Sequence, residues 1–297
     1  MRILLVMPHF FGEPIQDATN RSRLASARAE RLRALVAAIC GPHQALGTGA
    51  YGLDHGEAKA WRSVTSETDV LDIVVCTTGN AHLLDEIRSL HALFRHAPTD
   101  AEPMMLGFEC HKVLRAARGR YDYYGFVEDD VVLADPLFFR KRKLFDDRFG
   151  PDALLQPNRY EFSPTSPVHK LYVDYRLKPH VTARYQDVTD MPHLHMPFLD
   201  GEVSFERTTY PSAGCFFLSA DQLERWVEGP YFLDGDTSYL SALDSAVTLS
   251  VMKTFRVYKP VLQAALFLEV LHASPRWIGS VTRVATLANL ADEKAGS

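Results

Sequence analysis

Apolar positions follow two different periods in the first half of the chain. Short apolar runs at 2–7 and 72–78 predict buried β-strands, and an aromatic run from Tyr121 predicts a third. Between and after these runs, apolar residues recur at helical spacing, which predicts helices at 22–40, 80–94, 105–117 and 136–150. This βαβα order is typical of an α/β fold with a central, mostly parallel sheet flanked by helices.

The pattern changes in the second half. Residues 157–211 are rich in Pro, Tyr, His and Thr and show little periodicity, so we expect long loops with short antiparallel pieces, one of them in 170–175. Regular patterns return further on and predict strands at 213–219 and 256–262 and helices at 220–229 and 236–255. We therefore expect an α/β architecture whose second half is loop-rich.

Composition narrows the choice of function. A chain of 297 residues with 46% hydrophobic content can bury the core of one domain. Its net charge of -5, with acids and bases interspersed, gives no basic stripe, so we expect no nucleic acid partner. The apolar run at the N-terminus stops at Pro8, and we expect no transmembrane segment and a cytoplasmic location.

Cysteines give a further exclusion. The four residues are far apart and form no C-x-x-C pair, so the sequence predicts neither a cysteine zinc site nor a disulfide framework.

Three adjacent acids interrupt the aromatic strand. Glu128, Asp129 and Asp130 follow the apolar run and are followed at once by another. On a strand, Glu128 and Asp130 would share one side, and at the carboxyl edge of a parallel sheet they could share a divalent cation such as Mg²⁺ or Mn²⁺. Without metal, crowding should raise the pKa of at least one carboxyl. The alternative interpretation is a solvated acidic turn.

The acidic run, in this order of elements, resembles the D-x-D motif of the GT-A-fold glycosyltransferases, with Glu128 in place of the first Asp. That family transfers a sugar from a nucleotide-diphosphate donor. The resemblance implies a GT-A-like Rossmann-type fold forming a single catalytic domain over 1–297, with a nucleotide-binding half at 1–135 and an acceptor-binding half at 136–297. It implies that Glu128 and Asp130 bind metal and that Glu128 and Asp129 contact the donor.

Four further positions match the family's pattern. Ser212 and Gly214 would form a small-residue loop beneath the acceptor, which could equally be an ordinary turn. Asp244 matches the second acid of an x-E-D motif whose first acid is replaced by Leu243, and would act as catalytic base. We expect Asp244 at the rim of an apolar helical arc. His272 would be the last metal ligand, closing over the site from a C-terminal loop, although a lone His is more often structural.

The remaining candidates are donor-binding residues. Arg276 could fork onto the diphosphate, although it could also be a surface Arg. Pro8, His9 and Thr77 end the first two strands, where the family grips the nucleotide. Lys112, on the helix before the acidic run, could reach phosphate or lie on a solvated face.

These features favour a metal-dependent glycosyltransferase that uses Mn²⁺ or Mg²⁺, a nucleotide-diphosphate sugar and a glycan or small-molecule acceptor, with inversion. One alternative is a nucleotidyltransferase or another metal-dependent phosphoryl enzyme, although "PHFFGEP" is not a Gly-rich phosphate loop. Another is a non-catalytic carbohydrate-binding or scaffold protein with a degenerate site.

Overall fold

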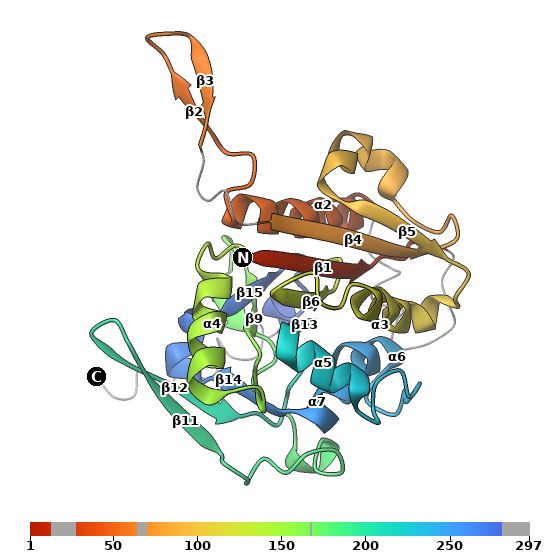
Figure 1. Ribbon diagram of the computed structural model, residues 1–297, viewed down its shortest axis with the longest axis vertical. Helices are drawn as coiled ribbons and strands as arrows, with labels where there is room; N and C mark the ends of the chain where they lie inside the picture. The colour runs from red at the N-terminus through yellow and green to blue at the C-terminus, as the bar shows by residue number, and fades with distance from the viewer. Residues whose placement is uncertain (13–27, 64–69, 167, 281–297) are drawn as a thin grey trace.

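The computed structural model describes residues 1–12, 28–63, 70–166 and 168–280. Its centre is a five-stranded sheet in the order β13-β6-β1-β4-β5 (Figure 1). The strands are β1 (Arg2–Pro8), β4 (Val70–Thr78), β5 (Arg95–Thr99), β6 (Tyr123–Val127) and β13 (Cys215–Ser219). β13 runs antiparallel to β6, and the other neighbours are parallel. The predicted α/β fold with a mostly parallel central sheet is confirmed.

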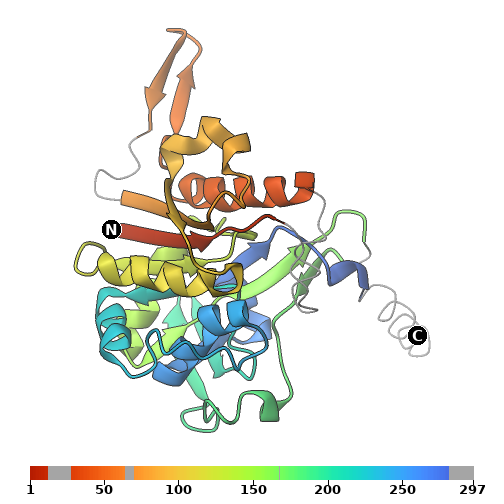
Figure 2. The ribbon, with the colours of Figure 1, turned by 90° about the vertical axis from the view of Figure 1, so that its right-hand side faces the viewer.

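Helices cover both faces of this sheet (Figure 2). Along β1, Ile3, Leu5 and Met7 pack on one side, while Leu4 and Val6 pack on the other, as the alternation of a strand requires. The first side faces α2 (Arg28–Ala45) and α4 (Phe138–Phe149). The second faces α3 (Leu106–Ala116), α5 (Ala220–Glu228) and the helical segment made of α6 (Ala242–Asp244), the π-helical η4 (Ser245–Leu249) and α7 (Ser250–Thr254).

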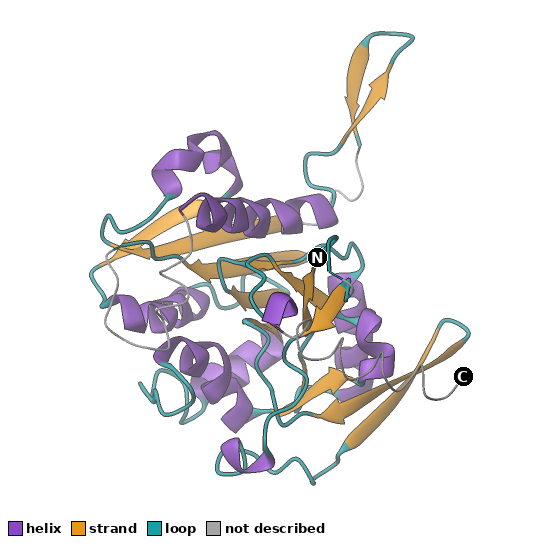
Figure 3. Ribbon diagram, turned by 180° about the vertical axis from the view of Figure 1, so that it is seen from behind, coloured by secondary structure: helices purple, strands orange, loops and turns teal. Residues whose placement is uncertain are grey.

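Two smaller sheets build the second half. One has the order β10-β9-β15-β7, and the other has the order β11-β12-β14-β8. Their strands are β7 (Val131–Val132), β8 (Ala153–Leu155), β9 (Asn158–Phe162), β10 (Lys170–Tyr172), β11 (His193–Phe198), β12 (Gly201–Arg207), β14 (Arg256–Pro260) and β15 (Glu269–His272). The ends of β11 and β12 extend beyond the body (Figure 3). The region 157–211 therefore holds more strand than expected.

The remaining elements are short. A separate hairpin is formed by β2 (Tyr51–Asp54) and β3 (Lys59–Arg62), and the 3₁₀ segments in the described residues are η1 (Leu84–Leu93), η2 (Pro103–Met105), η3 (Pro179–Val181) and η5 (Leu262–Phe267). Among the described residues, no helix is both long and apolar enough to cross a membrane. The cysteines described there are free thiols.

Two predicted helices need correction, and a third is described only in part. The segment 80–94 forms a 3₁₀ helix that is kinked at Ile87 instead of an α-helix. The helix predicted at 22–40 is confirmed over its described part, Arg28 onward, and continues to Ala45, while 22–27 lie outside the described residues. The helix predicted at 236–255 begins later, at Ala242, because Ser241 caps it and Leu240 adopts a positive φ of 50°.

Candidate functional site

The acidic run lies in a turn and not on a strand, which corrects the sequence-based interpretation. β6 ends at Val127, and the N–H of Val131 donates to the C=O of Glu128 at 3.0 Å to close the turn into β7. Glu128, Asp129 and Asp130 are nevertheless 2%, 5% and 1% exposed. The solvated-turn alternative is therefore wrong: three carboxylates are buried at the carboxyl ends of β6 and β1.

A guanidinium and an imidazole bind the Asp129 carboxylate. Its Oδ2 accepts from Nδ1 of His9 at 2.7 Å and from the guanidinium of Arg31 at 2.5 Å. The Nε2 of His9 in turn accepts from the N–H of Leu83 at 3.0 Å, which fixes the neutral tautomer with the proton on Nδ1. Burial would raise the pKa of Asp129, but Arg31 and His9 outweigh it and lower that pKa below its usual value.

Asp130 lies between Arg31 and His272. Its Oδ2 is 3.4 Å from the Arg31 guanidinium and 3.5 Å from Nε2 of His272. His272 is the last residue of β15 and pairs with Val131, so a strand, not the expected loop, delivers it beside the acidic turn. Burial opposes a charged imidazole, but the nearby Asp130 and Glu161 carboxylates prevail and raise the pKa of His272.

Glu161 fixes the orientation of His272. Its Oε1 accepts from Nδ1 of His272 at 2.8 Å, and its two oxygens also accept the backbone N–H groups of Arg276, Trp277 and Ile278. Burial alone would raise the pKa of Glu161, but these donors lower it. A buried carboxylate thus holds both His272 and the segment that carries Arg276.

Glu128 points to a different cation. Its Oε2 lies 3.5 Å from Arg159, which also makes a two-pronged ion pair with Asp174 at 2.7 and 3.0 Å. Burial would lower the pKa of Arg159, but Asp174 and Glu128 raise it, so this guanidinium stays charged.

Gly214 packs directly against the acidic turn. Its C=O accepts from the N–H of Glu128 at 2.8 Å, and its φ is +64°. A Cβ at Gly214 would stand 2.8 Å from Oε2 of Glu128 and 2.9 Å from the Val131 side chain. Glycine is required here both by the backbone conformation and by the close approach.

Buried Lys259 holds the small-residue loop. Its Nζ donates to the C=O of Ser212 at 2.6 Å and to that of Asp174 at 3.1 Å. Burial lowers the pKa of Lys259 to about 8. Ser212 is buried as well. Lys259 thereby joins the predicted acceptor loop to the Arg159–Asp174 pair.

Asp244 occupies a helix N-terminus. Ser241 caps α6: its hydroxyl accepts from the N–H of Asp244 at 3.1 Å and donates to Oδ2 of Asp244 at 2.6 Å. The Asp244 side chain is half-buried. The predicted apolar arc is corrected, since Leu240 precedes the helix and is 50% exposed.

Acids from both groups influence the pKa of Tyr210. Its pKa is raised by burial first and then by Asp174, Asp244 and Glu128, although Arg159 opposes the rise. Asp244 and Glu128 therefore both lie within electrostatic reach of one phenol, although 116 positions separate them in the printed numbering. The structure brings Asp244 to the same end of the sheet as the acidic turn.

Other predicted residues lie apart from this group or have their own partners. Lys112 is exposed on α3 and pairs with Glu109 at 2.6 Å, and no contact with the acidic turn is described for it. Thr77 is buried, and its Oγ1 bonds to Nε2 of His96 at 2.8 Å. Pro8 ends β1 directly before His9.

A cavity of about 320 Å³ lies beside Thr77 and His96. Its lining comes from the segment between β4 and β5 and from the start of β5, and comprises Asn80, His82, Leu84, Asp85, His91, Phe94 and His96. Burial first, and then the neighbouring His82, lower the pKa of His96, although Asp85 opposes this. Two hydrogen bonds link the segment that lines this cavity to the acidic turn: the N–H of Leu83 donates to His9, and His9 donates to Asp129.

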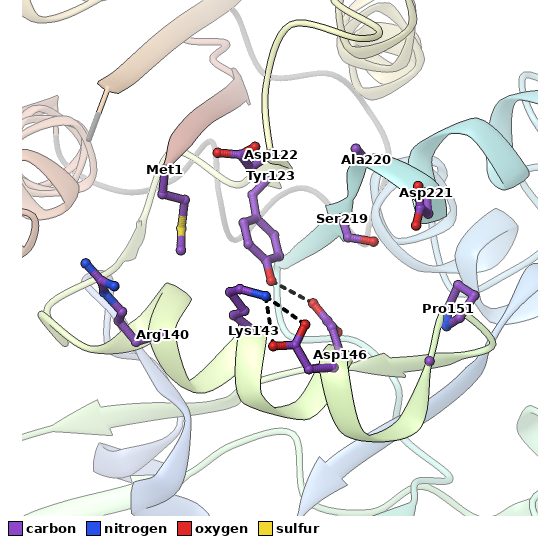
Figure 4. A pocket seen from close by; sticks show the side chains of 12 residues that line it. Met1, Asp122, Tyr123, Arg140, Lys143, Asp146, Pro151, Ser219, Ala220 and Asp221 are labelled. Carbon is purple, nitrogen blue, oxygen red and sulfur yellow. Dashed lines mark hydrogen bonds and ion pairs between the residues drawn. The ribbon is translucent and has the colours of Figure 1, made fainter. Parts of the chain in front are cut away.

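A larger cavity, of about 530 Å³, lies at the opposite edge of the sheet (Figure 4). Met1 and Asp122, at the amino ends of β1 and β6, line it together with α4 residues, and Tyr123 donates to Asp146 at 2.9 Å there. None of the predicted site residues lines it.

Sequence reasoning missed the partners of the acids, namely Arg31, Arg159, Glu161, Asp174, Tyr210 and Lys259. One signal was available, because Arg31 occupies the same buried helical face as Leu35, Ala38 and Ile39.

The predicted metal ligands converge in part. Asp130 and His272 are adjacent, and the hydrogen bond from Nδ1 of His272 to Glu161 is the type of support that metal-ligating histidines receive. Glu128 faces Arg159 instead. Within the described part of the chain, no three His, Cys, Asp or Glu side chains are grouped as a metal site. Asp130 and His272 could therefore supply part of the coordination of a metal ion, and further ligands would have to complete it.

Comparisons with known proteins give fold likenesses at low identity. No family model and no curated protein matches the chain. Among solved structures, residues 1–349 of S. aureus TarS match 87% of this chain at 10% identity with a TM-score of 0.43. The complex of the same TarS residues with UDP-GlcNAc matches 93% of this chain at 10% identity with a TM-score of 0.40. The structure of CMP:2-keto-3-deoxy-manno-octonic acid synthetase complexed with CTP matches at 12% identity with a TM-score of 0.38, and the match covers 99% of this chain and 100% of the synthetase chain.

These likenesses do not assign an activity. The matches to TarS 1–349 and to its UDP-GlcNAc complex cover 58% and 61% of those chains, and each of these TM-scores is below 0.5.

Proposed function

We propose that this chain is a glycosyltransferase that uses a nucleotide-diphosphate sugar, on a GT-A-like fold, with the acidic turn at its centre. The observation that carries the proposal is the burial of the Glu128–Asp130 turn at the carboxyl edge of the sheet, where Arg31, Arg159 and His272 converge on its carboxylates. Open α/β sheets bind their ligands at this edge. The proposed donor and acceptor would meet between the two groups of acids.

The donor would bind along β1 and β4. The cavity beside Thr77 and His96 has room for the nucleobase, and His9 links it to Asp129. Asp130 and His272 would hold Mn²⁺ or Mg²⁺, with oxygens of the donor diphosphate completing its coordination. When bound, the ion would supply positive charge against the leaving diphosphate. Arg276, held near His272 by Glu161, would supply a second charge.

Asp244 would act on the acceptor. A carboxylate within hydrogen-bond reach of the acceptor hydroxyl removes its proton as the oxygen bonds to the anomeric carbon and the bond to the diphosphate breaks. Attack from the face opposite the leaving group inverts that carbon. The Ser212–Gly214 loop, fixed by Lys259, would support the acceptor.

A ligand panel tests this proposal. Nucleoside diphosphates, their sugars and nucleoside triphosphates are each added with and without Mn²⁺, and thermal unfolding is followed. A ligand at a hundred times its Kd adds about 2.7 kcal/mol to the free energy of unfolding. A transferase binds diphosphates with Mn²⁺ and no acceptor, whereas a nucleotidyltransferase favours triphosphates and releases pyrophosphate. A scaffold shows no Mn²⁺-dependent binding, and that result would reject the proposal.

The metal assignment has its own variant. Asp130→Asn should abolish the Mn²⁺-dependent part of donor binding, while Asp147→Asn, which alters an exposed acid paired with Lys143, should leave it unchanged. If Asp130→Asn binds nucleotide and Mn²⁺ like the parent, the metal lies elsewhere.

A further inference from the structure

The β2–β3 hairpin stands away from the rest of the protein (Figures 1 and 3). Apart from half-buried Asp54, all its strand residues are exposed. Three of them are large and apolar: Tyr51, Leu53 and Trp61 are 63%, 65% and 60% exposed. A lone two-stranded hairpin is at best marginally stable in water, so this element gains stability from whatever pairs with it.

One face of the hairpin is mostly apolar. Tyr51 and Leu53 lie two residues apart and therefore point to the same side, together with their cross-strand partners Arg62 and Ala60. Trp61 pairs with Gly52 and lies on the other side.

The outer edge of β2 offers backbone groups for pairing. The C=O of Ala50 accepts from the N–H of Ser63 at 2.7 Å, so residue 50 forms an inward-bonded pair. Inward and outward positions alternate in an antiparallel ladder. The N–H and C=O groups of Tyr51 and Leu53 therefore point outward, at the same two residues that supply the apolar face.

We propose that a second copy of this chain pairs antiparallel along β2, with Gly52 opposite Gly52. In this register each Tyr51 lies opposite Leu53 of the second copy, and their outward backbone groups bond to one another. Opposite residues of a sheet share a face, so both apolar faces join into one, through an aromatic–aliphatic pair on each side of the two-fold axis. The hairpins become a four-stranded sheet in the order β3-β2-β2-β3.

The distribution of charge favours pairing along the edge of β2 instead of β3. Both basic residues of the two strands, Lys59 and Arg62, are on β3, and edge lysines oppose strand pairing. Across a two-fold axis, β3 edges would bring these cations together, whereas β2 has no basic residue. The acids Asp54 and Glu57 balance the two bases, so the hairpins of two copies do not repel. The turn at 55–58 carries Glu57 and no large apolar residue, which disfavours insertion into a membrane instead.

Sedimentation velocity on the full chain tests the pairing. A contact this small forms a weak, reversible dimer, so the parent is followed over a concentration series up to about 100 µM. The weight-average mass should rise toward two chains. Leu53→Lys should weaken association by at least about tenfold, because it places a cation on the pairing edge. Trp61→Lys, on the other face and strand, should leave it unchanged. A parent that stays monomeric, or a Leu53→Lys chain that dimerises like the parent, would overturn the proposal.

A cysteine pair tests the register. The two Gly52 residues would form a non-bonded pair with Cα atoms about 4.5 Å apart, within the range that a disulfide spans. No atom lies within 4 Å of a Cβ added at Gly52, so Gly52→Cys fits the monomer. With oxidised glutathione as the electron acceptor, the two thiols should join into a covalent dimer. Asp54→Cys should not link, since its copies would be about 14 Å apart. Equal cross-linking by both variants, or by neither, contradicts the register.

Discussion

The acidic turn and Asp244 carry the same functional group in opposite surroundings. At the turn, the carboxylates of Glu128, Asp129 and Asp130 are buried and face Arg159, Arg31 and two histidines. Asp244 is half-buried, and its described hydrogen bonds are to the Ser241 hydroxyl at the start of a helix. The turn's acids are held by several charged or polar partners, while Asp244 stays partly open to solvent.

These two environments suit two different chemical roles. A carboxylate fixed by arginine stays ionised and positions what binds beside it, but it accepts a proton poorly. A half-exposed carboxylate bound to one hydroxyl can exchange that partner for a substrate hydroxyl. We therefore expect substitutions at the turn to affect stability and donor binding, and substitutions at Asp244 to affect turnover.

The largest expected effect is on turnover. Asp244→Asn should keep donor affinity within a few-fold and reduce transfer by about 10²- to 10⁴-fold, because a positioned base is lost. Steady-state rates and donor titration measure the two quantities, with the exposed Asp200→Asn as control. Retained anomeric configuration in the product, seen by NMR, would leave Asp244 as an orienting residue only.

Arg31→Met probes the other side of the comparison. It leaves two buried carboxylates short of a cation, so the free energy of unfolding should fall by about 3–5 kcal/mol. Urea unfolding measures this, and the double variant with Asp129→Asn should recover part of the loss. Arg33→Met, two residues away on the exposed face of α2, is the control. If both arginine variants cost the same, the turn does not depend on Arg31.

Low pH should destabilise the protein through His111, which bonds to the helical segment directly after Asp244. His111 donates from Nε2 to the C=O of Ala246 at 2.8 Å, and burial lowers its pKa to about 4 from 6.5. Between these pH values the unfolded chain takes up a proton that the folded chain refuses. The free energy of unfolding therefore falls as pH drops from about 6.5 to about 4, by at most about 3 kcal/mol from this group.

Denaturation at pH 7 and pH 4.5 measures that fall. His111→Phe should show a smaller difference between the two pH values than the parent, whereas His55→Phe, in an exposed turn, should not. A pH dependence unchanged by His111→Phe would remove this residue from the acid response.

The smallest effect is at Gly214. Gly214→Ala combines a positive φ with a close approach to Glu128, and should cost about 2 kcal/mol and weaken donor binding. Gly119 has a φ of +72° with nothing within 4 Å of an added Cβ, so Gly119→Ala should show the backbone cost alone, about 1 kcal/mol. Equal losses in unfolding experiments would mean that the contact with Glu128 relaxes freely.

Local patterns predicted the parts of this protein that depend on near neighbours. β1, β4, α3 and β13 follow from periodicity, and so does the position of the acids after β6. The partners of those acids do not, because Arg31 and Glu161 come from elements whose neighbours are set by the tertiary fold. The β2–β3 hairpin was missed because its four-residue strands carry one or two large apolar side chains each, too few to show a period. β5 was missed because "RHAPT" has a proline and little apolar content.

The span of the contacts around the acidic turn determines when it can form. His9 and Asp129 are separated by 120 residues, and Glu161 and His272 by 111. At translation rates of about 5–20 residues per second, roughly 6–22 s pass between the synthesis of Glu161 and that of His272. During that interval the central parallel strands β1, β4, β5 and β6 are already synthesised, whereas the buried acids lack β15. The site is therefore among the last parts of the nascent chain to be completed, and a chain that stops before residue 269 carries an acidic turn without the β15 strand and His272.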